Sequence, residues 1–242
     1  MERDRRGEMA IAAARLLRDG ERVLVGVGLP NLAANIARRV HAPNLVLVYE
    51  SGVIDARPTR PPLSIGDPDL VRTSLAVVPI LDLFSQYLQP GWIDVGLLGG
   101  AQVDRRGNLN STVIGSYDHP TVRLAGSGGA ADIASFAKRT VVLLPQSLER
   151  FPARIDFVTS PGHPLGLRRE RGPDAVVTDL GVFDFDADGE MRLAATYEGV
   201  SAEDVQVRCG WRLRVARDLG VVPSPTPAEL DALRSLGGQG RA

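Results

Sequence analysis

Apolar runs alternate with helical patterns along the first part of the chain. Ala- and Leu-rich spacing over Glu8–Arg18 predicts a helix, and the apolar run Arg22–Val25 predicts a short buried strand. A second helix is expected over Pro30–Val40, with Asn31 as a candidate cap, followed by a strand over Leu45–Tyr49. Strand, turn, helix and strand form the order of a βαβ unit. The pattern therefore predicts an α/β fold with an open, mostly parallel sheet flanked by helices.

The rest of the chain continues this alternation. Residues 55–69, rich in Pro, Arg and Asp, are expected to form a long loop, a kind of segment that is often functional. The other expected elements are a helix over Leu81–Leu88, strands over Ile93–Gly100 and Thr140–Pro145, a turn at Arg105–Asn108, a meander with a turn at Asp186–Gly189, and a helix capped by Ser201 and Asp204. We expect one domain over residues 1–222, with a short helix and a frayed tail over 223–242.

Composition narrows the function classes. The 242 residues carry a net charge of −1, which gives no electrostatic argument for binding nucleic acid or an anionic membrane. The start, Met1–Arg6, lacks the apolar core of a signal peptide, and no apolar stretch approaches the ~20 residues of a membrane span. The single cysteine, Cys209, excludes an internal disulfide and fits a reducing cytoplasm; its context favours a packed residue over a nucleophile. The three histidines lie far apart, so no metal site is expected.

Three features follow predicted strands, where α/β sheets gather their ligands. They are the Gly26–Gly28 turn, Glu50–Gly52, and the glycine-rich Gly126–Gly129. Glycines let a backbone approach a ligand closely, and a following helix points N–H groups at it, which suits an anion or an oxyanion. A tight turn that needs positive φ explains the Gly126–Gly129 segment about equally well.

The Gly26–Gly28 turn also suggests a dinucleotide loop. The third glycine of that motif is missing, because Asn31 occupies its position. Glu50 nevertheless lies roughly 20 residues further on, where a ribose partner would be found. Nicotinamide binding therefore stays as a rival interpretation at this stage.

Glu50 has three interpretations from residue type alone. It is a solvated strand end, an acid paired with Arg57, Arg60 or Arg72, or a reactive carboxylate. The first two are commoner. A rigid, partly desolvated carboxylate at a strand end is, however, suited to attack a carbonyl and form a covalent acyl intermediate.

Several ordered stretches together carry a family resemblance. "GVGLPNLAANIARRVHAPNLVLVYESGVIDA", "LLGGAQVDRRGNLNSTVIGSYDHP", "RLAGSGGAADIASFAK" and "VTSPGHP" resemble the β subunit of class I coenzyme A transferases. The glutaconate CoA-transferase type is the nearest match, and the C-terminal half of succinyl-CoA:3-oxoacid CoA-transferases is a more distant one. The resemblance covers roughly residues 8 to 210, and its specificity comes from the order and spacing of the stretches.

The resemblance implies the CoA-transferase (NagB/RpiA-like) fold and a ping-pong reaction between an acyl-CoA and a carboxylic acid. Glu50 takes the position of the family's nucleophile, which carries CoA as a glutamyl thioester. CoA is then a substrate and no cofactor is expected, while a separate α subunit is expected to complete the enzyme. The residues that match the oxyanion and CoA-binding loop are Gly126, Ser127, Gly128, Gly129 and Ala130. Those that match site-lining positions are Gly28, Ser51, Gly52, Gly99 and Gln102.

Two departures leave alternatives open. Succinyl-type enzymes have Glu-Asn-Gly where this chain has Glu50-Ser51-Gly52, which bears on the substrate and not on the mechanism. Some relatives lack the glutamate and hydrolyse ring-derived CoA thioesters, an activity that the retained Glu50 argues against. A CoA-binding subunit without chemistry is a third hypothesis. Arg57, Arg60 and Arg72 are candidate partners for a dicarboxylate substrate, although salt bridges within the loop are their commoner use.

Overall fold

The computed structural model describes residues 4–58, 60, 62–164 and 172–237. The chain divides into two compact units. Unit 1 comprises residues 1–97 and 224–242, and unit 2 comprises residues 98–223. The proposed boundary between a domain over 1–222 and a tail stays a prediction, and the frayed end over 238–242 lies outside the described residues.

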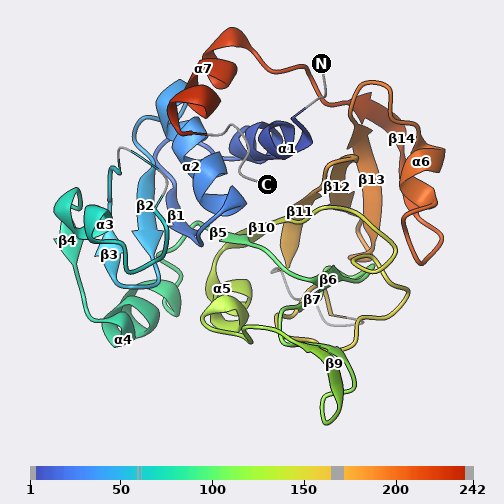
Figure 1. Ribbon diagram of the computed structural model, residues 1–242, viewed down its shortest axis with the longest axis horizontal. Coiled ribbons are helices and arrows are strands. Elements are labelled where there is room, and N and C mark those ends of the chain that lie inside the picture. Colours follow the sequence, from blue (N-terminus) through green and yellow to red (C-terminus); the bar gives the residue numbers. More distant parts are fainter. Residues whose placement is uncertain (1–3, 59, 61, 165–171, 238–242) are drawn as a thin grey trace. The chain divides into compact units, whose positions relative to one another are not determined.

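Unit 1 is built on a mixed sheet in the order β5-β1-β2-β3-β4 (Figure 1). β1 (Arg22–Val25) pairs in parallel with β2 (Val46–Tyr49) and with β5 (Val95–Leu98). β3 (Val53–Ile54) returns antiparallel to β2, and β4 (Ala76–Val77) is antiparallel to β3. The predicted βαβ unit is confirmed by the parallel strands β1 and β2, and the return strand β3 was not anticipated.

Three helices of unit 1 pack against one another: α1 (Arg5–Ala14), α2 (Leu29–Val40) and α7 (Pro227–Ser235) (Figure 1). α1 begins three residues before its predicted start, because the Asp4 carboxylate accepts a hydrogen bond from the Gly7 N–H at 2.9 Å. The predicted tail helix is confirmed as α7. It is fastened to the α1 end by an ion pair of 2.7 Å between Arg15 and Glu229.

The loop predicted over residues 55–69 leads into α3 (Pro68–Arg72), and β4 follows it. The helix predicted over Leu81–Leu88 is present but irregular: α4 (Ile80–Asp82) continues as a π-helical segment η1 (Leu83–Leu88). The Ser85 hydroxyl donates to the Leu81 carbonyl at 2.8 Å, a side-chain bond that competes with regular helical pairing.

Unit 2 holds a second run of strands in the order β14-β13-β12-β11-β10. They are β10 (Arg139–Leu143), β11 (Pro173–Val177), β12 (Gly181–Phe185), β13 (Met191–Thr196) and β14 (Arg214–Val221). β10–β11 and β13–β14 are parallel, while β11, β12 and β13 form the predicted antiparallel meander. The predicted α/β class is confirmed, with strands that pair both ways and not mostly in parallel.

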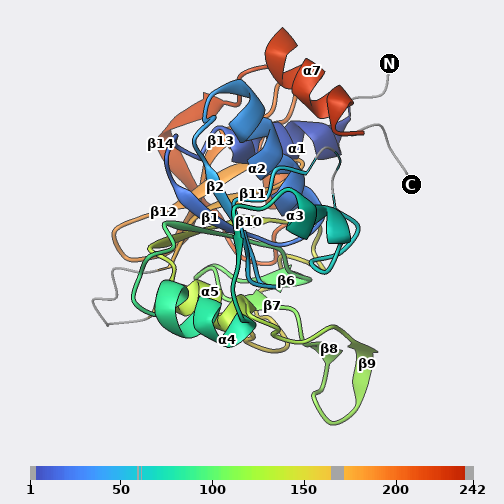
Figure 2. The ribbon, with the colours of Figure 1, turned by 90° about the vertical axis from the view of Figure 1, so that its left-hand side faces the viewer.

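Smaller elements complete unit 2. They are the hairpin β6 (Gln102–Val103) with β7 (Leu109–Asn110), the hairpin β8 (Val113–Gly115) with β9 (Pro120–Arg123), and the helices α5 (Ala130–Phe136) and α6 (Ala202–Gln206). The β8–β9 hairpin projects from the elements around it (Figure 2). The capping box predicted from Ser201 and Asp204 is confirmed at the start of α6. Within the described part of the chain, no helix is long and apolar enough to cross a membrane.

Candidate functional site

Glu50 lies in a tight turn between two strands. The Gly52 N–H donates to the Tyr49 carbonyl at 2.9 Å, which places Glu50 and Ser51 at the two central positions of the turn. The chain then returns as β3, with Ile54 opposite Val48. The half-buried Glu50 is therefore held at the tip of a hairpin that is itself paired into the sheet. A carboxylate on such a turn has little freedom to move away.

Gly52 is the residue that makes this turn feasible. Its φ is +90°, and a Cβ added there would lie 1.9 Å from the Val78 carbonyl oxygen. The Val78 N–H also donates to the Gly52 carbonyl at 2.9 Å. The residue after β4 thus clamps the turn so closely that only glycine fits.

Ser51 carries an unusual hydroxyl. Its Oγ is buried, and within the described residues it has no hydrogen-bond partner. A buried polar atom without a partner has a free-energy cost of roughly 1–3 kcal/mol, so its retention needs a reason. Next to Glu50, it is a donor available to a bound molecule.

A buried polar network supports the turn from below. The Asn31 side-chain amide donates to the Tyr49 hydroxyl at 2.7 Å, and Asn35 donates to the Asn31 side-chain oxygen at 3.0 Å. All three residues are buried, and burial raises the pKa of Tyr49 above its usual value. The network ties β2 to α2 just before Glu50.

The suggestion that Asn31 caps α2 is wrong. Gly28 holds the N-cap position with φ +81°, and Asn31 lies inside the helix, where its side chain is committed to Tyr49. The spacing of Asn31 and Asn35 by one helical turn on an otherwise apolar face was the available signal for this buried network.

The Gly28 turn and Glu50 lie at the same edge of the unit 1 sheet. β1 and β2 are parallel, with Val25 opposite Tyr49, so the residues that follow both strands leave the sheet together. The predicted residues Gly28, Glu50, Ser51 and Gly52 are therefore brought to one edge.

The arginines of the 55–72 segment have local partners. Arg60 binds Asp67 through two contacts of 2.9 and 3.2 Å, and Arg72 pairs with Asp69. Hydrogen bonds from the Leu63 N–H and the Arg60 guanidinium lower the pKa of Asp67 to about 2. These two arginines thus hold the loop itself together, which is the commoner of their two expected uses.

Arg57 lies in a different setting. It lines a hollow of about 210 Å³ together with Asn35, Arg38, Arg39 and Pro58. It contacts Asp55 at 3.4 Å, and the largely buried Arg38 approaches the same carboxylate at 3.2 Å.

The glycine-rich loop of unit 2 is anchored on one side and open on the other. The Gly126 N–H donates to the Ser111 carbonyl and its carbonyl accepts from the Ser111 hydroxyl, both at 2.9 Å. Gly126 and Gly128 have positive φ values of +90° and +48°, which explains the glycines conformationally. Ser127 and Gly128 are exposed, and their N–H groups have no hydrogen-bond partner within the described residues. These N–H groups can therefore bind an oxygen anion.

Gln102 serves an internal network. It is buried, its amide oxygen accepts from Asn110 at 2.7 Å and from the Asp156 N–H at 3.0 Å, and its amide nitrogen donates to the Asp156 carboxylate at 3.0 Å. This satisfies both ends of its amide, so its assigned contribution to a ligand site stays a prediction. Gly99 is exposed after β5, and a Cβ there would meet the Leu143 carbonyl only at ordinary contact distance.

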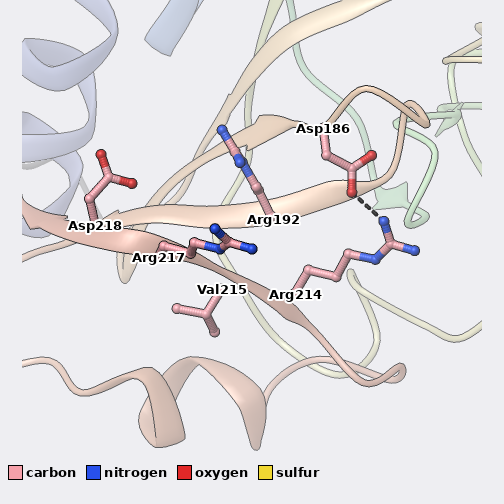
Figure 3. Close-up of a pocket in the computed structure, with 6 residues that line it drawn as sticks. All are labelled: Asp186, Arg192, Arg214, Val215, Arg217 and Asp218. Carbon is pink, nitrogen blue, oxygen red and sulfur yellow. Dashed lines mark hydrogen bonds and ion pairs between the residues drawn. The ribbon is translucent and has the colours of Figure 1, made fainter.

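A larger hollow of about 580 Å³ lies over β13 and β14 of unit 2 (Figure 3). Arg192 forms a two-contact ion pair with Asp184, and Arg214 binds Asp186 and further carboxylates. The residues lining the hollow are Asp186, Arg192, Arg214, Val215, Arg217 and Asp218. The arginines are matched by nearby carboxylates, so this surface lacks the excess positive charge of an anion site.

Cys209 is a packed residue, as predicted. It is buried, and burial raises the pKa of its thiol to about 11. A thiol protonated at neutral pH is a poor nucleophile, so Cys209 is no rival to Glu50.

Comparison with known proteins places the chain in a family. Residues 7–208 match the family model described as coenzyme A transferase. The chain is 46% identical to the β-type subunit of 3-oxoadipate CoA-transferase from Pseudomonas knackmussii, over 94% of this chain and 91% of that protein. The crystal structure of glutaconate coenzyme A-transferase from Acidaminococcus fermentans matches with a TM-score of 0.88 and 36% identity, covering 95% of this chain and 93% of that one. The decarboxylase AibA/AibB matches with a TM-score of 0.84 and 31% identity, over 96% and 94% of the two chains. This chain therefore belongs to the coenzyme A transferase family, as a β-type chain.

Proposed function

We propose that this chain is the β subunit of a CoA-transferase that moves CoA from an acyl-CoA to a carboxylic acid, with Glu50 as the nucleophile. The observation that carries the proposal is the position of Glu50. It is held by a clamped turn at the carboxyl edge of a parallel strand pair, beside the helix-capping Gly28. A nucleophile held in this way needs little reorganisation before it attacks.

The proposed reaction has two matched halves. A carboxylate oxygen of Glu50 attacks the thioester carbonyl, the C–S bond breaks, and CoA leaves as a thiolate while an acyl-glutamyl anhydride forms. The thiolate then attacks the Glu50 carbonyl carbon, which releases the donor acid and leaves a glutamyl-CoA thioester. The acceptor carboxylate repeats these steps in reverse and leaves as the new acyl-CoA, so Glu50 is regenerated. The order is ping-pong, and no redox or metal chemistry is needed.

Two sets of donors have assigned roles. Each attack on a carbonyl develops negative charge on its oxygen, and N–H or O–H groups stabilise such charge. We assign the buried Ser51 hydroxyl to the acyl group bound at Glu50. We assign the exposed N–H groups of Ser127 and Gly128 to a thioester oxygen, as the family resemblance implies.

The relatives suggest a substrate and a partner. The 46% identical protein is one subunit of a 3-oxoadipate CoA-transferase, and the 37% identical one is the corresponding subunit of a glutaconate CoA-transferase. We therefore propose 3-oxoadipate as the first acceptor acid to test, glutaconate as the second, and an α-type chain as the partner. The single cysteine is consistent with a cytoplasmic complex.

The similarity to a decarboxylase supports one alternative. AibA/AibB shares the fold at 31% identity, so decarboxylation of an acyl-CoA is a second candidate reaction. Decarboxylation releases CO₂ and needs no acceptor acid. Thioester hydrolysis releases free CoA, also without an acceptor, whereas the proposed transfer depends on an acceptor.

The decisive experiment traps the intermediate. The α/β complex is incubated with an acyl-CoA and then with hydroxylamine or borohydride, and the digested peptides are measured by mass spectrometry. Modification is expected at Glu50, and Glu50→Gln is expected to lower kcat by about 10³-fold or more because the covalent route is lost. Glu203→Gln, which changes an exposed glutamate of α6, is the matched control and should leave kcat unchanged.

Unmodified Glu50 together with full turnover in Glu50→Gln would refute the mechanism and favour a CoA-binding subunit without chemistry. Release of CO₂ or free CoA at the same rate with and without acceptor acid would instead identify a decarboxylase or a hydrolase.

A further inference from the structure

A short exposed apolar segment lies beside the Glu50 turn. Leu75 is 79% exposed, Val77 54%, Ile80 56% and Leu81 73%. These four large side chains fall within seven consecutive residues, which we call the 75–81 strip. The strip comprises β4, α4 and their flanking residues, which lie at one margin of the unit 1 sheet (Figure 1).

Nothing within this chain explains the apolar character of the strip. Both residues of β4 are exposed, and α4 has no buried residue. Strands and helices are normally stabilised by burying an apolar face, and an edge strand with apolar side chains is an aggregation hazard unless something covers it. β4 is the terminal strand in the sheet order, so one of its edges has no neighbouring strand within the described residues.

The exposed area has the size of a protein interface. The four side chains together expose on the order of 500 Å², against about 800 Å² that each partner buries in a standard stable complex, while a typical monomer's largest apolar patch is about 300–600 Å². The strip thus supplies the apolar centre of an interface, which a polar rim would complete.

The strip is joined to the Glu50 turn by two short connections. The Val78 N–H donates to the Gly52 carbonyl at 2.9 Å, and Val77 pairs with Val53. A partner seated on the strip therefore contacts the strand that clamps the turn. Since Glu50 is two residues from Gly52, docking there fixes the position of the proposed nucleophile.

We infer that the 75–81 strip is the docking surface for the α-type chain, and that this partner presents a complementary apolar face to β4 and α4. The inference rests on the proposed function for the existence of that partner. The α-type chain is favoured over a second copy of this chain because the strip is continuous with the Glu50 turn, where the chain that completes the enzyme is needed.

The test compares binding by matched variants. This chain, the double variant Leu75→Asp/Leu81→Asp and the control Leu148→Asp are each mixed with the α-type CoA-transferase chain of the same organism. Leu148 is 55% exposed and belongs to unit 2, so its variant adds a surface charge away from the strip. Dissociation constants are measured by calorimetry and masses by light scattering, and thermal unfolding of each isolated variant shows whether it is folded.

The double variant is expected to weaken binding by roughly 100-fold, because aspartates would be buried against an apolar face, while the control binds normally. A milder variant, Leu75→Ala/Leu81→Ala, should weaken binding roughly 10-fold without added charge. Normal binding by folded double and alanine variants would overturn the inference. So would a homodimer that the double variant breaks while binding to the α-type chain is unaffected, since the occupant would then be a second copy.

Failure of this inference and failure of the proposed function give different results. If Glu50→Gln is inactive but the double variant still binds, the docking surface is wrong and the mechanism stands. If the double variant loses binding but Glu50→Gln keeps full activity, the surface stands and the mechanism is wrong. If wild-type chains do not associate at all, both the partner and the docking surface are refuted.

Discussion

Gly52→Ala tests whether the clamped turn positions Glu50. The added Cβ would lie 1.9 Å from the Val78 carbonyl oxygen, and the alanine would also have to adopt a φ of +90°. Contact between a carbon and an oxygen at that distance cannot be tolerated, so β4 must move away by more than about 1 Å. Such a shift breaks the 2.9 Å hydrogen bond from the Val78 N–H to the Gly52 carbonyl.

The magnitude has two parts that separate variants can measure. An L-residue in a left-handed conformation costs roughly 1–2 kcal/mol relative to glycine. Loss of the Gly52–Val78 hydrogen bond and the displacement of β4 add about 1–2 kcal/mol. We therefore expect Gly52→Ala to destabilise the chain by about 2–4 kcal/mol.

Gly20→Ala isolates the first part. Gly20 has a φ of +80° but no atom lies within 4 Å of a Cβ built there, so only the conformational cost applies. Urea unfolding of both variants should give a free energy of unfolding that is lower by about 1–2 kcal/mol more in Gly52→Ala than in Gly20→Ala. Turnover of the α/β complex should fall in Gly52→Ala alone, because only that variant moves the Glu50 turn. Equal destabilisation of the two variants, or full activity in a folded Gly52→Ala complex, would refute the clamp.

Three further outcomes are expected. Ser51→Ala should leave the unfolding free energy within about 0.5 kcal/mol, because the removed hydroxyl has no partner within the described residues, while lowering kcat of the complex; an unchanged kcat would contradict its assigned role. Asn31→Ala should cost about 1–3 kcal/mol because it leaves the Tyr49 hydroxyl buried without its donor, and Asn31→Ala in a Tyr49→Phe background should cost measurably less. The hydrogen bonds from Arg15 lower the pKa of Glu229 to about 2, so this carboxylate stabilises the fold above its unfolded pKa of about 4.5 and stops doing so as the pH falls toward 2. Glu229→Gln should therefore lower Tm at pH 7, and the gap to wild type should close in acid; a gap that is constant with pH would show that the ion pair contributes nothing.

Local elements and their order were readable from the sequence. Apolar runs and periodicity predicted β1, β2, β5 and β10, and turn chemistry predicted the β6–β7 and β12–β13 hairpins. Capping residues predicted the start of α6. These features depend on side-chain pattern and backbone conformation within a few residues, so the local sequence is sufficient to specify them.

Features that depend on distant parts of the chain were not readable. The sequence alone showed that Gly52 follows Glu50, but the clamp requires Val78, whose segment reaches the turn only through β3 and β4. Asn31 looked like a helix cap because a cap and a buried donor are the same residue type, and only the position of the Tyr49 hydroxyl distinguishes them. Gln102 matched a site-lining position by its neighbours in sequence, whereas the fold surrounds its amide with Asn110 and Asp156.

The candidate site divides along the same line. The sequence by itself determined which residues carry the chemistry: a strand-end glutamate, a serine and glycines, in an order that resembles one family. The tertiary structure alone decided how Glu50 is held, which hydroxyl beside it stays without a partner among the described residues, and which apolar segment remains exposed next to it. Residue type and spacing specify chemistry and local conformation, but the burial and partners of a side chain depend on segments that only folding brings into contact.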